Sequence, residues 1–188
     1  MQQGRRGFTI VELLIVIVVI AILAAIVIVA YNGVQGRARD SRRLQDLETI
    51  VKALEAYKTT HGNYPAAVST SGAAGWEVST NGTSVTNFLS ALVSSTDGVS
   101  RIPVDPVNTG DAADLSPAAA HNNYEYFYYR YGAGEYGCDS SRGEYYVVGI
   151  TRLDGTASGQ NSPSSPGFSC SGRNWSYEGA WVTGSYTN

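Results

Sequence analysis

The stretch that decides the fold is FTIVELLIVIVVIAILAAIVIVA, residues 8–30, in which only Thr9 and Glu12 interrupt a continuous apolar run. At about 1.5 Å per residue, a helix of this length spans roughly 34 Å, enough to cross the hydrocarbon core of a bilayer. Its β-branched residues are weak helix formers in water. In lipid, however, every backbone group must be hydrogen-bonded within the segment, so the membrane enforces the helix. The run therefore predicts a membrane-inserted helix.

Two ordinary explanations of this run fit less well. A secretory signal peptide has a shorter apolar region followed by a small-residue cleavage site, whereas here the apolar run continues through residues 24–27. A single-pass anchor fits the length but leaves Glu12 unexplained, because an acidic residue at mid-membrane costs about 2.5–3.5 kcal/mol, and less near the interface. From the residues alone, two interpretations of Glu12 stay open: it has a partner, or it reaches the headgroups or is protonated.

The segment RRGFTIVELL, residues 5–14, resembles the prepilin signature of the type IV pilin family. The shared features are a short basic leader that ends in glycine, then Phe-Thr, and a glutamate at the fifth position of the mature chain. The resemblance implies a leader peptide over residues 1–7, cleavage between Gly7 and Phe8 by a membrane-bound prepilin peptidase, and N-methylation of Phe8. It also implies that Phe8, Thr9 and Glu12 form the site of subunit assembly. Glu12 would pair with the amine of Phe8 on a neighbouring subunit, since a buried charge is tolerated only beside its partner.

From this resemblance we expect a non-enzymatic structural subunit, a major pilin, of an extracellular type IV pilus-like filament. The homo-oligomer would be helical, because a head-to-tail contact that does not close on itself propagates. The filament would support adhesion, twitching motility or DNA uptake. The expected partners are the prepilin peptidase, an inner-membrane assembly platform with its ATPase, and membrane lipid before assembly. No cofactor is expected.

Three alternatives stay open. The first is a pseudopilin of a type II secretion or competence apparatus, and the second is a minor pilin, which Glu12 disfavours. The third, from another class, is a single-pass membrane-anchored adhesin that never polymerises. We expect the precursor in the cytoplasmic membrane with its N-terminus inside. That orientation comes from the resemblance, because the arginines at positions 5 and 6 face four more at 37–43 across the run and charge counting is ambiguous.

Charge and cysteines bound the rest of the chain. The formal net charge of the 188 residues is −3, but residues 59–188 hold five basic and eleven acidic side chains. This acidic head makes nucleic acid an unlikely partner, since phosphate binding needs clustered cations. Cys138 and Cys170 are the two cysteines. They are either free thiols or a disulfide, and the export implied by the membrane segment favours the disulfide.

After the apolar run, the pattern predicts an amphipathic stem helix over residues 31–62. Leu44, Leu47, Val51 and Leu54 recur at helical spacing, whereas charged residues, Arg43 among them, occupy other faces. HGNYP at 61–65 then ends the helix. We expect one helix of about fifty residues rather than two. Its flexible point is predicted at Gly33 and Gly36, because each glycine costs about 1 kcal/mol in a helix interior.

The remaining residues, 63–188, predict a globular α+β head. A surface loop is expected from Pro65 to Ser84 and a short helix over 85–93. Strands are expected over 124–131, 144–153 and 175–186, forming an antiparallel meander that packs on the stem. The predicted divisions are thus a leader at 1–7, a transmembrane and filament-core helix at 8–30, the stem at 31–62 and the head at 63–188.

Signals for chemistry in the head are weak. The sequence contains no zinc-ligand or phosphate-loop motif, so neither catalysis nor a metal site is predicted. His61 at the helix end is expected to be a cap or a solvated side chain. Asp105, Asp111 and Asp114 are carboxylates that could hold calcium, but we favour solvated loop acids.

The tyrosines and possible modification sites give the last weak signals. The Tyr-rich strand over 124–131 is more typical of packing and surface coverage than of a sugar-binding or adhesive platform, and its imperfect alternation implies that some rings face outward. Asn81 and Asn174 match the N-glycosylation pattern, and the SPSSP segment at 162–166 is a candidate for O-linked sugar.

Overall fold

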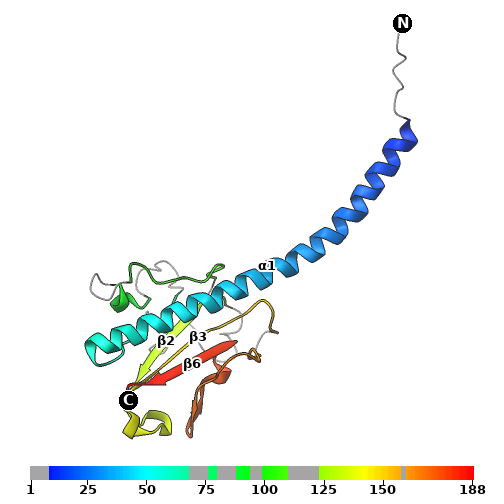
Figure 1. Cartoon of the computed structure of the whole chain (residues 1–188). Helices are drawn as coiled ribbons and strands as arrows, with labels where there is room; N and C mark the ends of the chain where they lie inside the picture. The colour runs from blue at the N-terminus through cyan, green and yellow to red at the C-terminus, as the bar shows by residue number, and fades with distance from the viewer. Residues whose placement is uncertain (1–8, 68–75, 80–87, 94–98, 110–122, 158–159) are drawn as a thin grey trace. The chain divides into compact units, whose positions relative to one another are not determined.

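The N-terminal third of the chain is dominated by one long helix. The computed structural model describes residues 9–67, 76–79, 88–93, 99–109, 123–157 and 160–188. Helix α1 spans Ile10–His61, which confirms one helix instead of two (Figure 1). Gly62 ends it with a left-handed φ of 80°, and its N–H donates to the carbonyl of Lys58 at 2.8 Å, as the glycine predicted.

The chain divides into two units, Met1–Ala38 and Arg39–Asn188, and each is described by itself. The second unit contains the stem part of α1 together with the head. The predicted divisions at residues 7, 30 and 62 stay predictions.

Within the described residues, the head is built on a four-stranded antiparallel sheet of order β1-β2-β3-β6. The strands are β1 (Glu77–Val78), β2 (Tyr126–Tyr131), β3 (Tyr145–Ile150) and β6 (Trp181–Tyr186). Figure 1 shows β2, β3 and β6 side by side along the stem. The predicted α+β class and three-stranded meander are confirmed.

Two local predictions for the head need correction. The surface loop predicted from Pro65 to Ser84 contains the edge strand β1, and residues 76–79 are buried because Trp76 and Val78 pack against the sheet. The short helix predicted over 85–93 is described only from Phe88. There it is a single 3-10 turn, η1 (Ser90–Leu92), preceded by Leu89 in a left-handed conformation.

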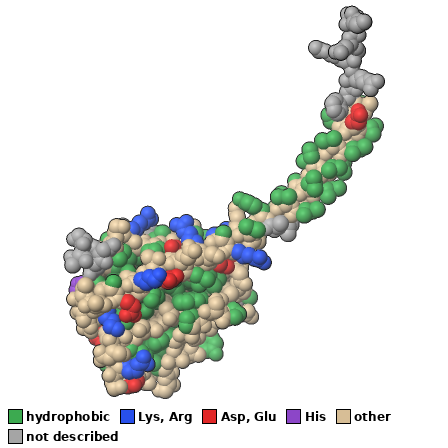
Figure 2. Space-filling model, in the orientation of Figure 1, with side chains coloured by type: hydrophobic (Ala, Val, Ile, Leu, Met, Phe, Trp, Pro, Cys, Tyr) green, Lys and Arg blue, Asp and Glu red, His purple; other side chains and the backbone are tan. Residues whose placement is uncertain are grey.

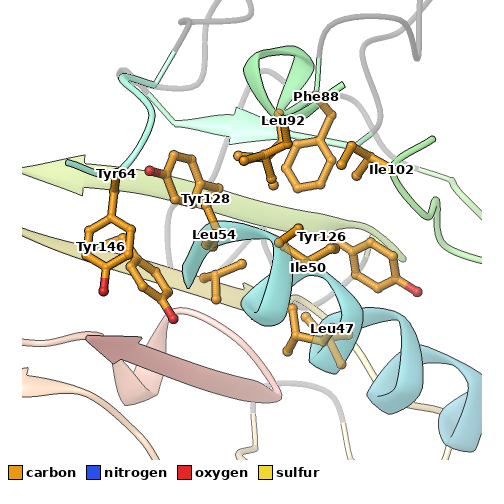
Figure 3. Packing of buried hydrophobic residues seen from close by; sticks show 14 of the residues in the cluster. Leu47, Ile50, Leu54, Tyr64, Phe88, Leu92, Ile102, Tyr126, Tyr128 and Tyr146 are labelled. Atoms are coloured by element: carbon orange, nitrogen blue, oxygen red, sulfur yellow. The ribbon is translucent and has the colours of Figure 1, made fainter. Parts of the chain in front are cut away.

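The first hydrophobic core lies between the stem and the sheet. Leu47, Ile50 and Leu54 of α1 are at most 1% exposed and face the sheet (Figure 3). Tyrosines of β2 and β3 pack against them, and two of these tyrosines also donate hydrogen bonds through their hydroxyls. Tyr126 donates to Asp46 of the stem at 3.0 Å, and Tyr128 donates to the carbonyl of Pro65 at 2.6 Å. Aromatic residues therefore fill this core and also bind the stem to the sheet.

A second core covers the opposite face of the sheet, and the sequence did not predict it. Alternate residues of β2 point there, and they pack against Trp175 and neighbouring aromatic rings. The covering segments are three short 3-10 helices and the β4-β5 hairpin: η3 (Glu135–Gly137), η4 (Ser140–Arg142), η5 (Trp175–Tyr177), β4 (Ser169–Cys170) and β5 (Arg173–Asn174). The predicted Cys138–Cys170 disulfide is confirmed, and it ties η3 to this hairpin.

The free edge of β6 is covered by residues 162–167. Ser162 N–H donates to the carbonyl of Ala180 at 2.6 Å, and Gly167 N–H donates to the carbonyl of Val182 at 3.0 Å. Ser165 Oγ also donates to that carbonyl and accepts from Val182 N–H. This segment contains Pro163 and Pro166, which lack backbone N–H groups. The segment considered for O-linked sugar therefore has a structural role at the sheet edge.

Arg43 is buried, although its charge predicted an exposed face of the stem. Its side chain is 0% exposed and lies four residues before Leu47, in the same stripe as the apolar core residues. Its guanidinium donates to Asp105 at 2.7 and 3.3 Å, to Asp40 at 2.8 Å and to Asp154 at 2.8 Å. Asp105 is itself buried, so the expectation of a solvated acid at this position was wrong.

The aspartates around Arg43 fix the stem to two loops of the head. Asp40 also accepts from the backbone N–H of Asp154 at 2.8 Å, and Arg39 donates to Asp154 at 2.9 Å. Burial alone would raise the pKa of Asp154, but hydrogen bonds from Arg39, Arg43 and Tyr124 outweigh burial and hold that pKa below its ordinary value. The charged form of this network is therefore the stable one.

Candidate assembly site

The N-terminal part of α1 exposes an apolar surface along its length. Between Ile10 and Ile28, the exposed fractions of the large apolar side chains run from 47% at Val18 to 84% at Ile10. Figure 2 shows these side chains along the helix. A continuous apolar surface of this extent marks a contact with lipid or with other protein. By length and composition, α1 is the one helix in the described part of the chain that is suited to cross a membrane.

At the start of this helix, Thr9 and Glu12 form a reciprocal cap. Glu12 Oε2 accepts from the backbone N–H of Thr9 at 2.9 Å and from its hydroxyl at 2.7 Å. In return, Thr9 Oγ1 accepts from the backbone N–H of Glu12 at 3.3 Å. This is the capping box that a Thr-x-x-Glu spacing encodes. The Thr-x-x-Glu spacing at residues 9–12 is a sequence signal that could have predicted this cap.

The capping box restricts where the Glu12 carboxylate points. Both hydrogen bonds that the side chain accepts from Thr9 use Oε2, so the carboxylate is held over the first helical turn. A helix N-terminus carries a partial positive charge and therefore disfavours a cation. The Glu12 carboxylate compensates for this, so a cation is favoured only beside it. Cleavage between residues 7 and 8 would leave Thr9 and its N–H in place. Gly7 and Phe8 lie outside the described residues, so their roles in cleavage, methylation and assembly stay predictions.

The predicted flexible point is helical in this structure. Residues 33–36 continue α1 without interruption. A Cβ added to Gly33 would meet nothing within 4 Å, so packing does not require glycine there. The proposed flexibility at Gly33 and Gly36 concerns the assembled filament, and it stays a prediction.

The other candidate residues do not converge. Asp105 is engaged by Arg43, whereas Asp111, Asp114 and Asn81 lie outside the described residues. Across the described ranges, no three His, Cys, Asp or Glu side chains are placed to hold a metal ion. His61 ends α1 and stacks on Tyr57, with ring centroids 3.9 Å apart. Asn174 is exposed, and its side chain accepts from Ser176 N–H at 3.0 Å.

Comparisons with known proteins agree with the resemblance of the N-terminal segment to the prepilin signature. Residues 2–28 match the family described as the prokaryotic N-terminal methylation motif. The chain is also 31% identical, over 64 residues, to the type II secretion system core protein G of Klebsiella michiganensis. That match covers 34% of this chain and 45% of the relative, less than half its length. No solved structure matches. The methylation motif, the long helix and the small antiparallel head together support a type IV pilin-like or pseudopilin-like protein.

Proposed function

We propose that the chain is the major structural subunit of a type IV pilus-like filament and polymerises through its N-terminal helix. The observation that carries the proposal is the exposed apolar surface of residues 10–28, which begins at a fixed carboxylate. In the precursor, lipid would cover this surface. In the filament, the same side chains would pack against like helices, where close packing and polar contacts replace lipid. The subunit has a structural role, and the chemistry is supplied by the peptidase that processes it.

In this mechanism, cleavage after Gly7 creates the charge that Glu12 needs. The amine of Phe8, once freed and methylated, would pair with Glu12 of a neighbouring subunit. A buried ion pair contributes little when complete, but loss of one partner leaves an uncompensated charge and costs about 3–5 kcal/mol. The pair would therefore set the register between subunits, and an uncleaved precursor would be excluded. The capping box supports this role because it holds the carboxylate in place before a partner arrives.

The capping box also supplies a rival explanation of Glu12, in which the residue only caps its own helix. Glu12→Gln separates the two, because glutamine at this position keeps a capping box but carries no charge. We expect Glu12→Gln to insert in the membrane at the wild-type level and to lose surface filaments as completely as Glu12→Ala. Thr9→Val, which removes the cap and keeps the charge, should reduce filament number less. Glu48→Gln, a charge removal on an exposed stem residue, is the matched control and should leave filaments unchanged.

The measurement is the filament yield per cell by electron microscopy and immunoblotting, with the N-terminus of sheared filaments read by mass spectrometry. Filaments of Glu12→Gln at the wild-type level would refute the ion pair. A mature protein that still starts with its leader, or that remains monomeric, would favour the single-pass adhesin instead.

A second candidate is a pseudopilin, which the similarity to a type II secretion core protein supports. It would use the same N-terminal helix to build a short secretion or competence fibre. Both candidates depend on the proposed assembly site. Long surface fibres that contain this subunit at native expression would favour the pilus, whereas loss of secreted proteins in a deletion strain without surface fibres would favour the pseudopilus.

A further inference from the structure

The head contains a small aromatic pocket that has no part in the proposed assembly mechanism. Its volume is about 240 Å³, and its lining residues are Trp76, Tyr129, Tyr131, Glu135, Tyr136 and Arg173. They come from the β1 edge, from β2, from η3 and from the β4-β5 hairpin. From these contacts we infer that the pocket binds a neutral sugar ring, a site on the face of the sheet opposite the stem.

The aromatic walls stand at steep angles to one another and leave a slot. Trp76 meets Tyr131 at 80° with centroids 6.0 Å apart, and Tyr131 meets Tyr136 at 88° with centroids 5.5 Å apart. The floor is fixed, since Trp76 is 5% exposed, Tyr131 is 3% exposed, and the Tyr131 hydroxyl accepts from Trp175 Nε1 at 2.9 Å. In contrast, Tyr136 is 46% exposed and forms an accessible wall. Rigid aromatic faces beside polar groups are typical of small-molecule sites.

The backbone around Tyr136 is built to hold that wall in place. Tyr136 has a left-handed φ of 51°, a costly conformation for a non-glycine residue that persists only where its surroundings impose it. Its carbonyl accepts from Gly172 N–H at 2.9 Å, and a Cβ on Gly172 would lie 2.7 Å from that oxygen. The Cys138–Cys170 disulfide joins the same two loops. Strain of this kind clusters at ligand sites.

The charges in the pocket select the class of ligand. The Arg173 guanidinium already lies over the rings of Tyr136 and Trp76, 5.0 and 5.9 Å from their centroids, and occupies the position that a cation would take. Arg173 is paired with Glu178 at 2.8 Å, and the carboxylate of Glu135 on the lining repels an anion. A purely apolar ligand would displace water from the remaining hydrogen-bonding positions of the Arg173 guanidinium and the Glu135 carboxylate without replacing it.

A neutral, hydroxylated ring satisfies all of these groups. Its C–H faces pack on the aromatic walls, and its hydroxyls exchange hydrogen bonds with Arg173, Glu135 and the tyrosines. The volume is below the roughly 300–1,000 Å³ of sites for drug-sized ligands, which suits one ring rather than an oligosaccharide. The site lies wholly within the head, so the inference stands whether or not the proposed filament forms.

The test is saturation-transfer NMR on the full chain, in a detergent without a sugar headgroup. The probes are the methyl glycosides of glucose, galactose and N-acetylglucosamine, with choline and a pentaproline peptide as probes of other classes. We expect transfer to the ring protons of at least one methyl glycoside. Tyr136→Leu should weaken this binding by about tenfold, and Glu135→Ala should weaken it as well. The matched control, Tyr177→Leu, removes a 65% exposed tyrosine outside the pocket and should leave binding unchanged.

Tryptophan-fluorescence melting of each variant shows whether its head is folded. The inference is overturned if no methyl glycoside binds the folded wild-type chain, or if choline or the proline peptide binds and the sugars do not. It is also overturned if both pocket variants are folded and keep wild-type affinity. Loss of sugar binding in either folded pocket variant, with Tyr177→Leu unaffected, supports it.

Discussion

Replacing the buried Arg43 by methionine should destabilise the head more than replacing any other charged residue of the stem. Methionine approximates the length of the arginine stem, so the packing loss is small, but the positive charge disappears. Asp105, whose side chain is 0% exposed, would then be a buried carboxylate without its cation. Asp40 and Asp154 would each lose one of their partners.

The size of the effect follows from this burial. Removing one partner of a buried ion pair typically costs about 3–5 kcal/mol. For a domain of about 150 residues, 1 kcal/mol shifts Tm by about 2–4 °C, so we expect Tm to fall by about 10 °C. Arg42→Met is the control. Arg42 is the next residue, its side chain is 67% exposed, and its pair with Asp46 is long, at 3.9 Å. Such a pair contributes about 0–1 kcal/mol.

The assay is thermal unfolding of the full chain in detergent, followed by tryptophan fluorescence. All three tryptophans, at positions 76, 175 and 181, lie in the unit that begins at Arg39, so the signal reports that unit. The double variant Arg43→Met with Asp105→Asn should recover part of the loss, because neutral asparagine needs no cation and residues in direct contact are energetically coupled. If Arg43→Met changed Tm no more than Arg42→Met, the description of Arg43 as the buried centre of this network would be wrong.

Three further outcomes are expected. Cys138→Ser with Cys170→Ser should lower the free energy of unfolding by about 2–5 kcal/mol, measured by urea titration against the oxidised wild-type chain, and equal midpoints for oxidised and reduced wild-type protein would contradict this. Gly33→Ala should stiffen α1 by about 1 kcal/mol without a clash, so if the filament needs a bend there, membrane levels will stay constant while filament yield falls, and an unchanged yield would remove the need for flexibility. Because the folded pKa of Asp154 is depressed, its stabilisation is fully present above its unfolded pKa of about 3.9 and is lost as pH falls towards the folded value; Tm should therefore drop in acid, and Asp154→Asn should flatten that drop.

The parts of the fold that depend on periodicity could be predicted from the sequence. The apolar run and the Leu47–Leu54 spacing gave one long helix, and the Tyr-rich and Val-rich segments gave β2 and β3. These signals are strong because a single residue pattern repeats over many positions. The glycine after His61 ended the helix where predicted, since its left-handed conformation is a local property.

The failures share a cause, which is that burial depends on residues distant in sequence. Arg43 was assigned to the solvent face by its charge, yet three aspartates, one local and two from head loops, make its burial possible. The strand β1 has only two residues, too few for any alternation to be visible. The second core and the aromatic pocket beside it form only when the disulfide-linked loops fold back over the sheet. No short-range sequence pattern indicates that these loops pack there.

For the assembly site, the sequence alone gave the residues but not their contacts. Thr9 and Glu12 were selected through a family resemblance, whereas the hydrogen bonds between them follow from a three-residue spacing that any helix N-terminus can use. That distinction is what makes Glu12→Gln informative, because the cap is a property of one chain and the ion pair needs two.

Both edges of the sheet are protected against pairing with strands of other molecules, which matters where many heads lie close together. Exposed strand edges recruit other strands, which leads to amyloid-like growth when identical molecules are held at high density. Here one border ends in a two-residue strand, and the other is sealed by the serine- and proline-rich segment at 162–167. Many copies can therefore lie side by side without their sheets joining, and in the proposed filament polymerisation would depend only on the separate N-terminal surface.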